Sequence, residues 1–220
     1  MTSPAPVDAL LLISTGCPHC AGVAAALLRL VKEGQLGRLE VINLDRQPAP
    51  PAAQGVRGLP WLRIGAFEFT GAHGYRELAD WAARASTGLG WTDYLLALLA
   101  RGELDRVLAL VQAQPEHLGG LLDRLAGLAE LGARIGISAL VESLAGSAAL
   151  HAQVPRLVEL TQAPAAHTRA DACHFLGLAG VSEVCPAVAR LLDDEDPEVR
   201  EIASETLALL DRPQTEEVSR

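Results

Sequence analysis

The chain has 220 residues, of which 50% are hydrophobic, 20% charged and 4% aromatic, and its formal net charge at pH 7 is −9. This composition excludes a disordered chain, and the acidic charge and scarce aromatic residues argue against a nucleic-acid partner. No segment offers the ~18 uninterrupted apolar residues of a membrane span, and no basic region precedes an apolar stretch as in a secretory signal. We therefore expect a cytoplasmic protein without a membrane partner.

The first part of the chain alternates strand and helix signals. Continuous apolar runs predict strands buried on both faces, helical periodicity predicts amphipathic helices, and Gly65-Ala66 predicts a hairpin turn. Gly34 and Gly37 are expected to end the first helix. In chain order, we predict a strand at Val7–Ser14, a helix at Ala21–Lys32, a buried strand at Leu39–Leu44, a proline-rich loop at Gln47–Gln54, strands at Trp61–Ile64 and Phe67–Thr70, and a helix at Gly74–Ala85.

The segment Ser86–Gly90 consists of small residues and predicts a linker between two domains. Residues 1–86 carry a net charge of +1, whereas residues 87–220 carry −10 and show helical periodicity nearly throughout. The sequence thus predicts an α/β domain over residues 1–86, an all-helical domain over 91–211 and a flexible tail over 212–220.

The strongest chemical signal is Cys17-Pro18-His19-Cys20, which follows the first predicted strand and opens the first predicted helix. A thiolate at a helix N-terminus lies near unpaired N–H groups and the positive end of the helix dipole, so its pKa falls from ~8.5 towards ~3.5–7.5. Pro18 suits the first turn, where a missing N–H costs nothing. The spacing lets the second sulfur attack a mixed disulfide formed by the first. We therefore expect Cys17, the more exposed thiol, to be the nucleophile and Cys20 to be the resolving thiol.

A second element, Gly58-Leu59-Pro60-Trp61, opens the predicted hairpin. Together with the CxxC motif, it makes residues 6–86 resemble the thioredoxin superfamily. The resemblance implies a thioredoxin-like α/β fold with a β-α-β-β-β-α core, a cis peptide bond before Pro60 facing the cysteines, and a backbone contact from Leu59 to a substrate peptide. We place Gly16 and Trp61 beside the same substrate site. The Pro18-His19 pair resembles that of bacterial dithiol oxidases, in which the histidine stabilises the thiolate.

Two positions depart from the thioredoxin pattern. Leu11 replaces the buried carboxylate that accepts the proton of the resolving thiol, and Gly16 stands where tryptophan is common. His19 or water would then have to accept the proton of the Cys20 thiol. Two other functions stay open: a non-catalytic adaptor with an inactive thioredoxin-like domain, and a metal carrier in which the CxxC is half of a zinc site. The sequence indicates no cofactor and no complete metal site.

The helical part contains an internal repeat. Val154–Leu160 aligns with Cys185–Leu191 at an offset of 31 residues, and the same offset pairs Arg169 with Arg200. This pattern resembles short HEAT-like repeats over about 152–211, with no clear register over 91–150. Stacked helix pairs of this kind present a long surface that usually binds proteins. We therefore expect a protein partner that carries a disulfide or thiol, and self-association stays open.

Two further cysteines lie in the helical part, at Cys173 and Cys185. Three interpretations remain: two idle thiols, a local disulfide or second redox pair that exchanges with Cys17 and Cys20, and a metal site.

Overall fold

A computed structural model describes residues 5–127 and 131–211 of the chain. It divides into two compact units, with the division between Gly90 and Trp91. The tail predicted at 212–220 lies outside the described residues.

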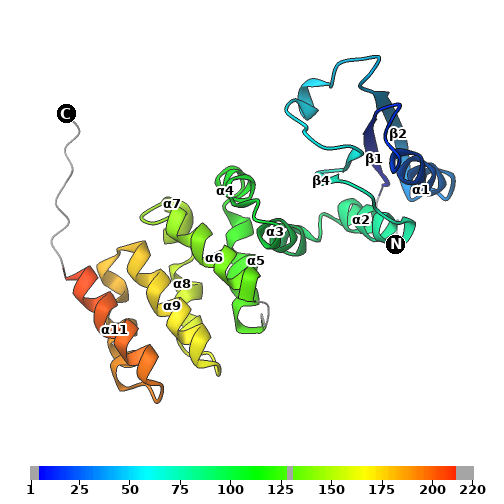
Figure 1. Cartoon of the computed structure of the whole chain (residues 1–220). Coiled ribbons are helices and arrows are strands. Elements are labelled where there is room, and N and C mark those ends of the chain that lie inside the picture. The colour runs from blue at the N-terminus through cyan, green and yellow to red at the C-terminus, as the bar shows by residue number, and fades with distance from the viewer. Residues whose placement is uncertain (1–4, 128–130, 212–220) are drawn as a thin grey trace, which may run out of the picture. The chain divides into compact units, whose positions relative to one another are not determined.

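The first unit is built on a small mixed sheet (Figure 1). Its elements are β1 (Val7–Ile13), α1 (Cys20–Lys32), β2 (Leu36–Asn43), the 3₁₀ turn η1 (Pro51–Ala53), β3 (Trp61–Ile64), β4 (Phe67–Thr70) and α2 (Tyr75–Thr87). The strand order is β2-β1-β3-β4, with β1 parallel to β2 and the other pairs antiparallel. This element order and the hairpin at Gly65-Ala66 confirm the sequence prediction.

The two faces of the sheet are covered differently. Leu10 and Leu12 of β1 form a buried cluster with Trp61 and with Ala53 of η1, so the segment between β2 and β3 covers this face. Side chains alternate between the faces of a strand, so Leu11 and Leu62 point to the opposite face. Helices α1 and α2 contact each other and the sheet there, and their positions are visible in Figure 1.

The strand β2 differs from its prediction in two ways. It begins at Leu36 rather than Leu39, so Gly37 lies inside the strand and does not end the helix. It is also not buried on both faces, because β2 is an edge strand with β1 as its neighbour, and Val41 is 46% exposed. An apolar run does not distinguish an edge strand from a central one, which explains the error.

The second unit is helical in all of its described elements. They are α3 (Trp91–Ala100), α4 (Leu104–Ala113), α5 (Glu116–Arg124), η2 (Leu125–Gly127), α6 (Leu131–Ser143), α7 (Ala148–His151), α8 (Val154–Leu160), α9 (Ala166–Ala179), η3 (Ser182–Val184), α10 (Cys185–Arg190), η4 (Leu191–Asp193) and α11 (Pro197–Leu210). The pair α8–α9 is repeated by α10–α11, and α9 and α11 have the same length and pack together. The predicted offset therefore corresponds to a repeated helix pair.

The repeat extends to hydrogen bonds. Arg169 Nη1 donates to the carbonyls of Ala163 and Pro164, both at 3.0 Å. Arg200 Nη1 donates to the carbonyls of Asp194 and Glu195 at 2.7 and 3.1 Å. In each helix pair, the arginine at the equivalent position thus donates hydrogen bonds to the turn that precedes its own helix.

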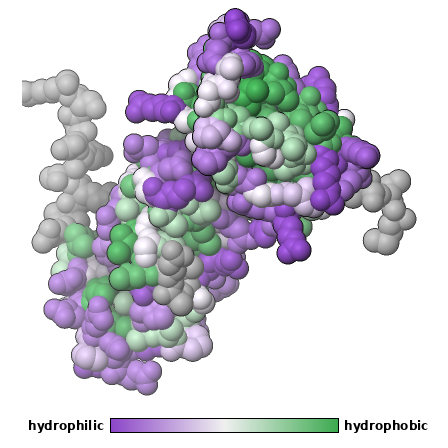
Figure 2. Space-filling view, turned by 45° about the vertical axis from the view of Figure 1, so that its right-hand side comes forward, coloured by the Kyte–Doolittle hydropathy of each residue, from purple (hydrophilic) through white to green (hydrophobic). Residues whose placement is uncertain are grey.

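Large apolar side chains are exposed in both units. They are Leu28, Val41 and Leu89 in the first unit and Leu131, Ile135, Leu192 and Leu209 in the second. On the face shown in Figure 2, the apolar surface is interrupted by hydrophilic side chains. Among the described residues, no helix combines the length and apolarity needed to span a bilayer.

Candidate functional site

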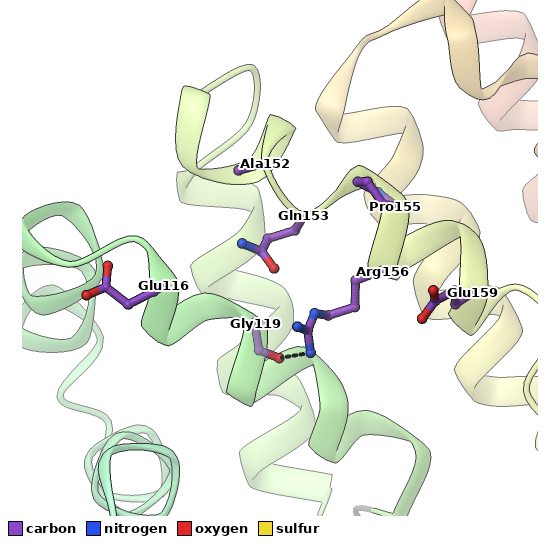
Figure 3. Close-up of a pocket in the computed structure, with 7 residues that line it drawn as sticks. All are labelled: Glu116, Gly119, Ala152, Gln153, Pro155, Arg156 and Glu159. Carbon is purple, nitrogen blue, oxygen red and sulfur yellow. Dashed lines mark hydrogen bonds between the residues drawn. The ribbon is translucent and has the colours of Figure 1, made fainter. Parts of the chain in front are cut away.

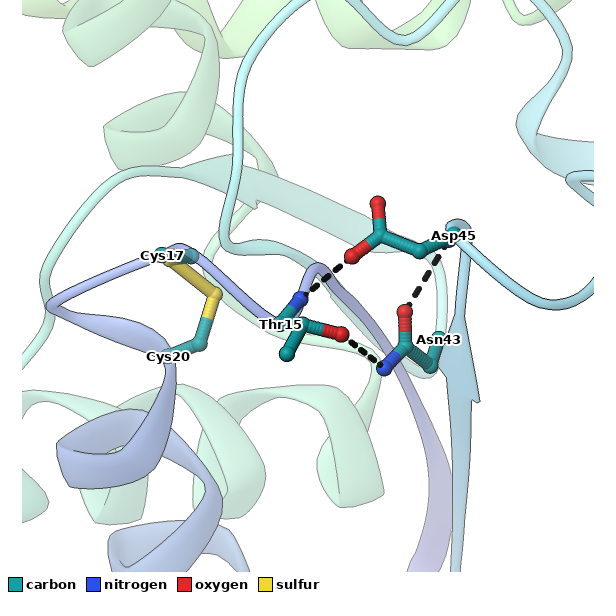
Figure 4. The surroundings of a disulfide bond; sticks show 5 residues. All are labelled: Thr15, Cys17, Cys20, Asn43 and Asp45. Atoms are coloured by element: carbon teal, nitrogen blue, oxygen red, sulfur yellow. Dashed lines mark hydrogen bonds between the residues drawn. A yellow bond between two sulfur atoms is a disulfide. The ribbon is translucent and has the colours of Figure 1, made fainter.

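The first unit contains a disulfide between Cys17 and Cys20, whose Cα atoms are 5.5 Å apart (Figure 4). Cys20 is 4% exposed, whereas Cys17 is partly exposed. A reagent or partner that approaches the bond from solvent therefore reaches Cys17 first. The two cysteines lie on the segment that joins the end of β1 to the start of α1.

Helix α1 starts beside this disulfide. It begins at Cys20, one residue before the predicted start, and its cap residue His19 makes no side-chain capping bond. The first intrahelical bond runs from the N–H of Val23 to the carbonyl of His19, and the first turn has no acidic residue. The N–H groups of the first turn thus remain available to a negative charge, and the helix dipole favours one there. In the reduced pair, an arrangement of this kind would favour a thiolate over a neutral thiol.

Two hydrogen bonds hold the loop before Cys17 to the end of β2, and a third lies within the end of β2 (Figure 4). The Thr15 N–H donates to Asp45 Oδ2 at 2.7 Å, Asn43 Nδ2 donates to Thr15 Oγ1 at 3.1 Å, and the Asp45 N–H donates to Asn43 Oδ1 at 3.0 Å. The bonds from the Thr15 backbone and hydroxyl, with the nearby Arg46 charge, hold the pKa of the Asp45 carboxyl below its ordinary value.

Sequence reasoning did not identify Thr15, Asn43 and Asp45 as site residues. A signal was present: β1 and β2 are parallel, so their carboxyl ends meet at one edge of the sheet. Asn43 pairs with Ile13 in the ladder, which brings the polar residues after β2 beside the segment after β1. The register, which fixes this proximity, is not visible in the sequence alone.

The start of β3 lies at the same end of the sheet. Trp61 pairs with Leu12 on one side and with Thr70 on the other, and the peptide bond between Leu59 and Pro60 is cis, as the family resemblance implies. Pro60 is buried and its carbonyl accepts a bond from the Gly71 N–H at 2.8 Å. The CxxC loop, the end of β2 and Leu59-Pro60 therefore lie at the same end of the sheet.

The other predicted site residues differ in exposure. Gly16, Pro18 and His19 are exposed on the loop, and Pro18 precedes α1 rather than lying in its first turn as predicted. Trp61 is 5% exposed in the core cluster, which leaves little of its surface for a substrate and favours a packing role. Leu11 is fully buried. Among the described residues, no group of three or more His, Cys, Asp and Glu side chains has the geometry to hold a metal ion.

Cys173 and Cys185 are free thiols in the structure. Cys173 is completely buried on α9, with its sulfur 3.8 Å from Thr206 Oγ1, and burial raises the pKa of its thiol to about 11. Cys185 is partly exposed at the start of α10. A thiol as weakly acidic as Cys173 is a poor nucleophile, so its burial does not favour a second redox pair.

The second unit contains a polar pocket of about 440 Å³ between α5 and α8. Figure 3 shows its lining: Glu116, Gly119, Ala152, Gln153, Pro155, Arg156 and Glu159. Arg156 donates to the Gly119 carbonyl at 3.2 Å and forms an ion pair with Asp123. A Cβ at position 119 would lie 3.0 Å from Gln153 Oε1, so glycine allows this close approach.

Comparison with known proteins identifies one part of the chain. Residues 154–218 match the family model for HEAT repeats, and this match begins at α8 and includes α9 to α11. A search of curated proteins returned no match to this chain. The C-terminal part of the chain is thus a helical repeat region similar to HEAT repeats, and it follows an α/β region that carries a disulfide-bonded cysteine pair.

Proposed function

We propose that the chain is a thiol–disulfide oxidoreductase whose first unit is a thioredoxin-like domain and whose helical unit binds a protein partner. The observation that carries this proposal is the Cys17–Cys20 pair beside the N-terminus of α1, with Cys17 partly exposed and Cys20 buried. An element order of β-α-β-loop-β-β-α with Leu59-Pro60 at the same sheet edge supports the thioredoxin-like assignment.

The chemistry proceeds in two exchanges. The Cys17 thiolate attacks one sulfur of a partner disulfide, which breaks the partner S–S bond, forms a mixed disulfide and releases one partner thiolate that takes a proton. Cys20 then loses its proton and attacks Cys17 Sγ, which releases the second partner thiol. The partner gains two electrons and two protons, and the protein is left with the Cys17–Cys20 disulfide. A low-molecular-weight thiol or dithiol restores the reduced pair.

The roles of the two cysteines make distinct predictions. Cys17→Ser removes the nucleophile and should abolish reduction of insulin disulfides, whereas Cys20→Ser should accumulate mixed disulfides with partners. Cys185→Ser is a matched control, because it removes a partly exposed thiol from the other unit and should leave the rate unchanged. Non-reducing gels and an insulin turbidity assay measure both effects. Wild-type turnover by Cys17→Ser contradicts the catalytic assignment.

A second candidate function is a protein-interaction adaptor without redox activity, which the HEAT match alone favours. It predicts that partner binding is the same with and without reductant and that Cys20→Ser traps nothing. The oxidoreductase predicts a reductant-sensitive, disulfide-linked complex, so the same gels discriminate between the two functions.

A further inference from the structure

The Asp45 carboxylate is bound to the loop that carries the cysteines. Its Oδ2 atom is 2.7 Å from the Thr15 nitrogen, and Asn43 bonds to both Thr15 Oγ1 and the Asp45 N–H. Thr15 precedes Cys17 by two residues, and two residues span at most ~7 Å. The carboxylate is therefore within about 10 Å of the Cys17 backbone, close to one Debye length at physiological ionic strength.

This negative charge acts against the other features of the motif. The N-terminus of α1 favours a thiolate, and so does a protonated His19, whereas the Asp45 charge disfavours one. Arg46 is the cation that acts on Asp45 itself. In the disulfide neither sulfur carries a charge, so repulsion from Asp45 affects the reduced pair alone.

We propose that Asp45 is a positioning residue for the Cys17–Cys20 pair: it holds the loop through Thr15, and its negative charge favours the disulfide over the dithiol. The pair thereby becomes a stronger reductant than the Cys-Pro-His-Cys motif by itself would be. This inference rests on the proposed redox function, and it identifies a residue outside the motif that shifts the equilibrium between the dithiol and the disulfide.

Equilibration with glutathione tests the effect of the Asp45 charge on the balance between disulfide and dithiol. Two protein thiols reduce one glutathione disulfide to two glutathione thiols, with two electrons and two protons transferred as the Cys17–Cys20 bond forms. Asp45→Asn removes the charge but keeps an oxygen acceptor for the Thr15 N–H. At about 10 Å in a largely aqueous environment, loss of one charge should lower the disulfide-to-dithiol ratio about twofold at a fixed glutathione ratio. Quantitative thiol alkylation and mass spectrometry measure that ratio.

Two further variants complete the experiment. Asp45→Ala removes both charge and acceptor, so it should show at least the same change in ratio together with faster hydrogen exchange of the Thr15 amide. Asp8→Asn is the matched control, because Asp8 is an exposed carboxylate at the opposite end of β1, paired with Arg38. It should leave the ratio unchanged.

The outcomes separate this inference from the proposed function. If wild type equilibrates with glutathione but Asp45→Asn gives the same ratio as Asp8→Asn, the role of Asp45 is wrong and the oxidoreductase stands. If the wild-type pair does not exchange with glutathione at all, the proposed function is overturned and this inference with it. Asp45→Asn is nearly isosteric, so it provides the test even if Asp45→Ala fails to fold.

Discussion

The surroundings of Cys17 and Cys173 differ in how well they stabilise a negatively charged sulfur. Cys17 is partly exposed on the loop that leads into α1, whereas Cys173 is buried on α9 with its sulfur 3.8 Å from Thr206 Oγ1. Helix N–H groups and their dipole stabilise a thiolate, and apolar burial destabilises one. We therefore expect the Cys17 and Cys173 thiols to differ in reactivity.

This contrast predicts the order of thiol labelling. In the reduced, folded protein at pH 8, Cys17 should react first with an aromatic disulfide reagent and Cys185 next. Cys173 should react only on unfolding, because burial raises its thiol pKa to about 11. Mass spectrometry of timed samples measures the order. Rapid labelling of Cys173 in folded protein would instead support a second redox pair with Cys185.

The sequence identified the residues of the CxxC motif but not the residues that form hydrogen bonds to its loop. Cys17-Pro18-His19-Cys20 is contiguous, so its chemistry is readable from spacing, and the exposure order of the two cysteines is confirmed. Asp45 is 28 residues from Cys17 in the chain and becomes a neighbour only through the parallel register of β1 and β2. For Trp61, the sequence identified the residue but did not predict which face of β3 its side chain occupies.

At the scale of elements, the two helix pairs of the repeat region use equivalent arginines with unequal partners. Arg169 forms two bonds to the Asp194 carboxylate, at 2.7 and 2.8 Å, and both side chains are less than a tenth exposed. Arg200 makes the two equivalent carbonyl bonds at an exposed position. The Asp194 pairing thus connects the turn after η4 to α9, which belongs to the preceding helix pair.

We predict that Arg169→Ala destabilises the helical unit by about 3 kcal/mol, because it leaves a buried carboxylate unpaired. Arg200→Ala is the matched control and should cost about 1 kcal/mol or less, since its bonds are exposed. Urea unfolding followed by circular dichroism measures both values. Equal losses in the two variants would show that the carbonyl bonds, rather than Asp194, carry the stability.

The Asp194 pairing also predicts a pH dependence. Arg169 holds the pKa of the Asp194 carboxyl below its ordinary value, so the folded pKa is below the unfolded one. The resulting stability is fully present above pH about 4 and is lost as pH falls through the folded pKa. The difference between wild type and Arg169→Ala should therefore shrink between pH 5 and pH 2. A difference that does not change over this range would contradict the pairing.

Element types were more predictable than element environments. Periodicity identified the hairpin at Gly65-Ala66 and the 31-residue repeat, because both depend on local spacing. The environment of β2 was predicted wrongly, since its place at the sheet edge depends on how the other strands pair. Helical character over 91–127 is confirmed without a repeat register, and the HEAT match begins only at residue 154.

The whole molecule combines an α/β unit that carries a cysteine pair with a helical repeat unit, and the charge is divided between them. Residues 87–220 carry a net charge of −10, whereas residues 1–86 carry +1. Protein binding is the general use of HEAT-type surfaces, and the proposed chemistry requires a disulfide-bearing partner. In this proposal, the helical unit supplies binding and the first unit supplies electron transfer.

The proposed electron transfer by the first unit depends on the acidity of the Cys17 thiol. Titration of the reduced protein by thiolate absorbance at 240 nm, with Cys17→Ser as the reference, measures it directly. We predict a Cys17 pKa clearly below the ~8.5 of a free cysteine, because the N-terminus of α1 stabilises the thiolate more than Asp45 opposes it. A Cys17 pKa of ~8.5 or above would contradict the account.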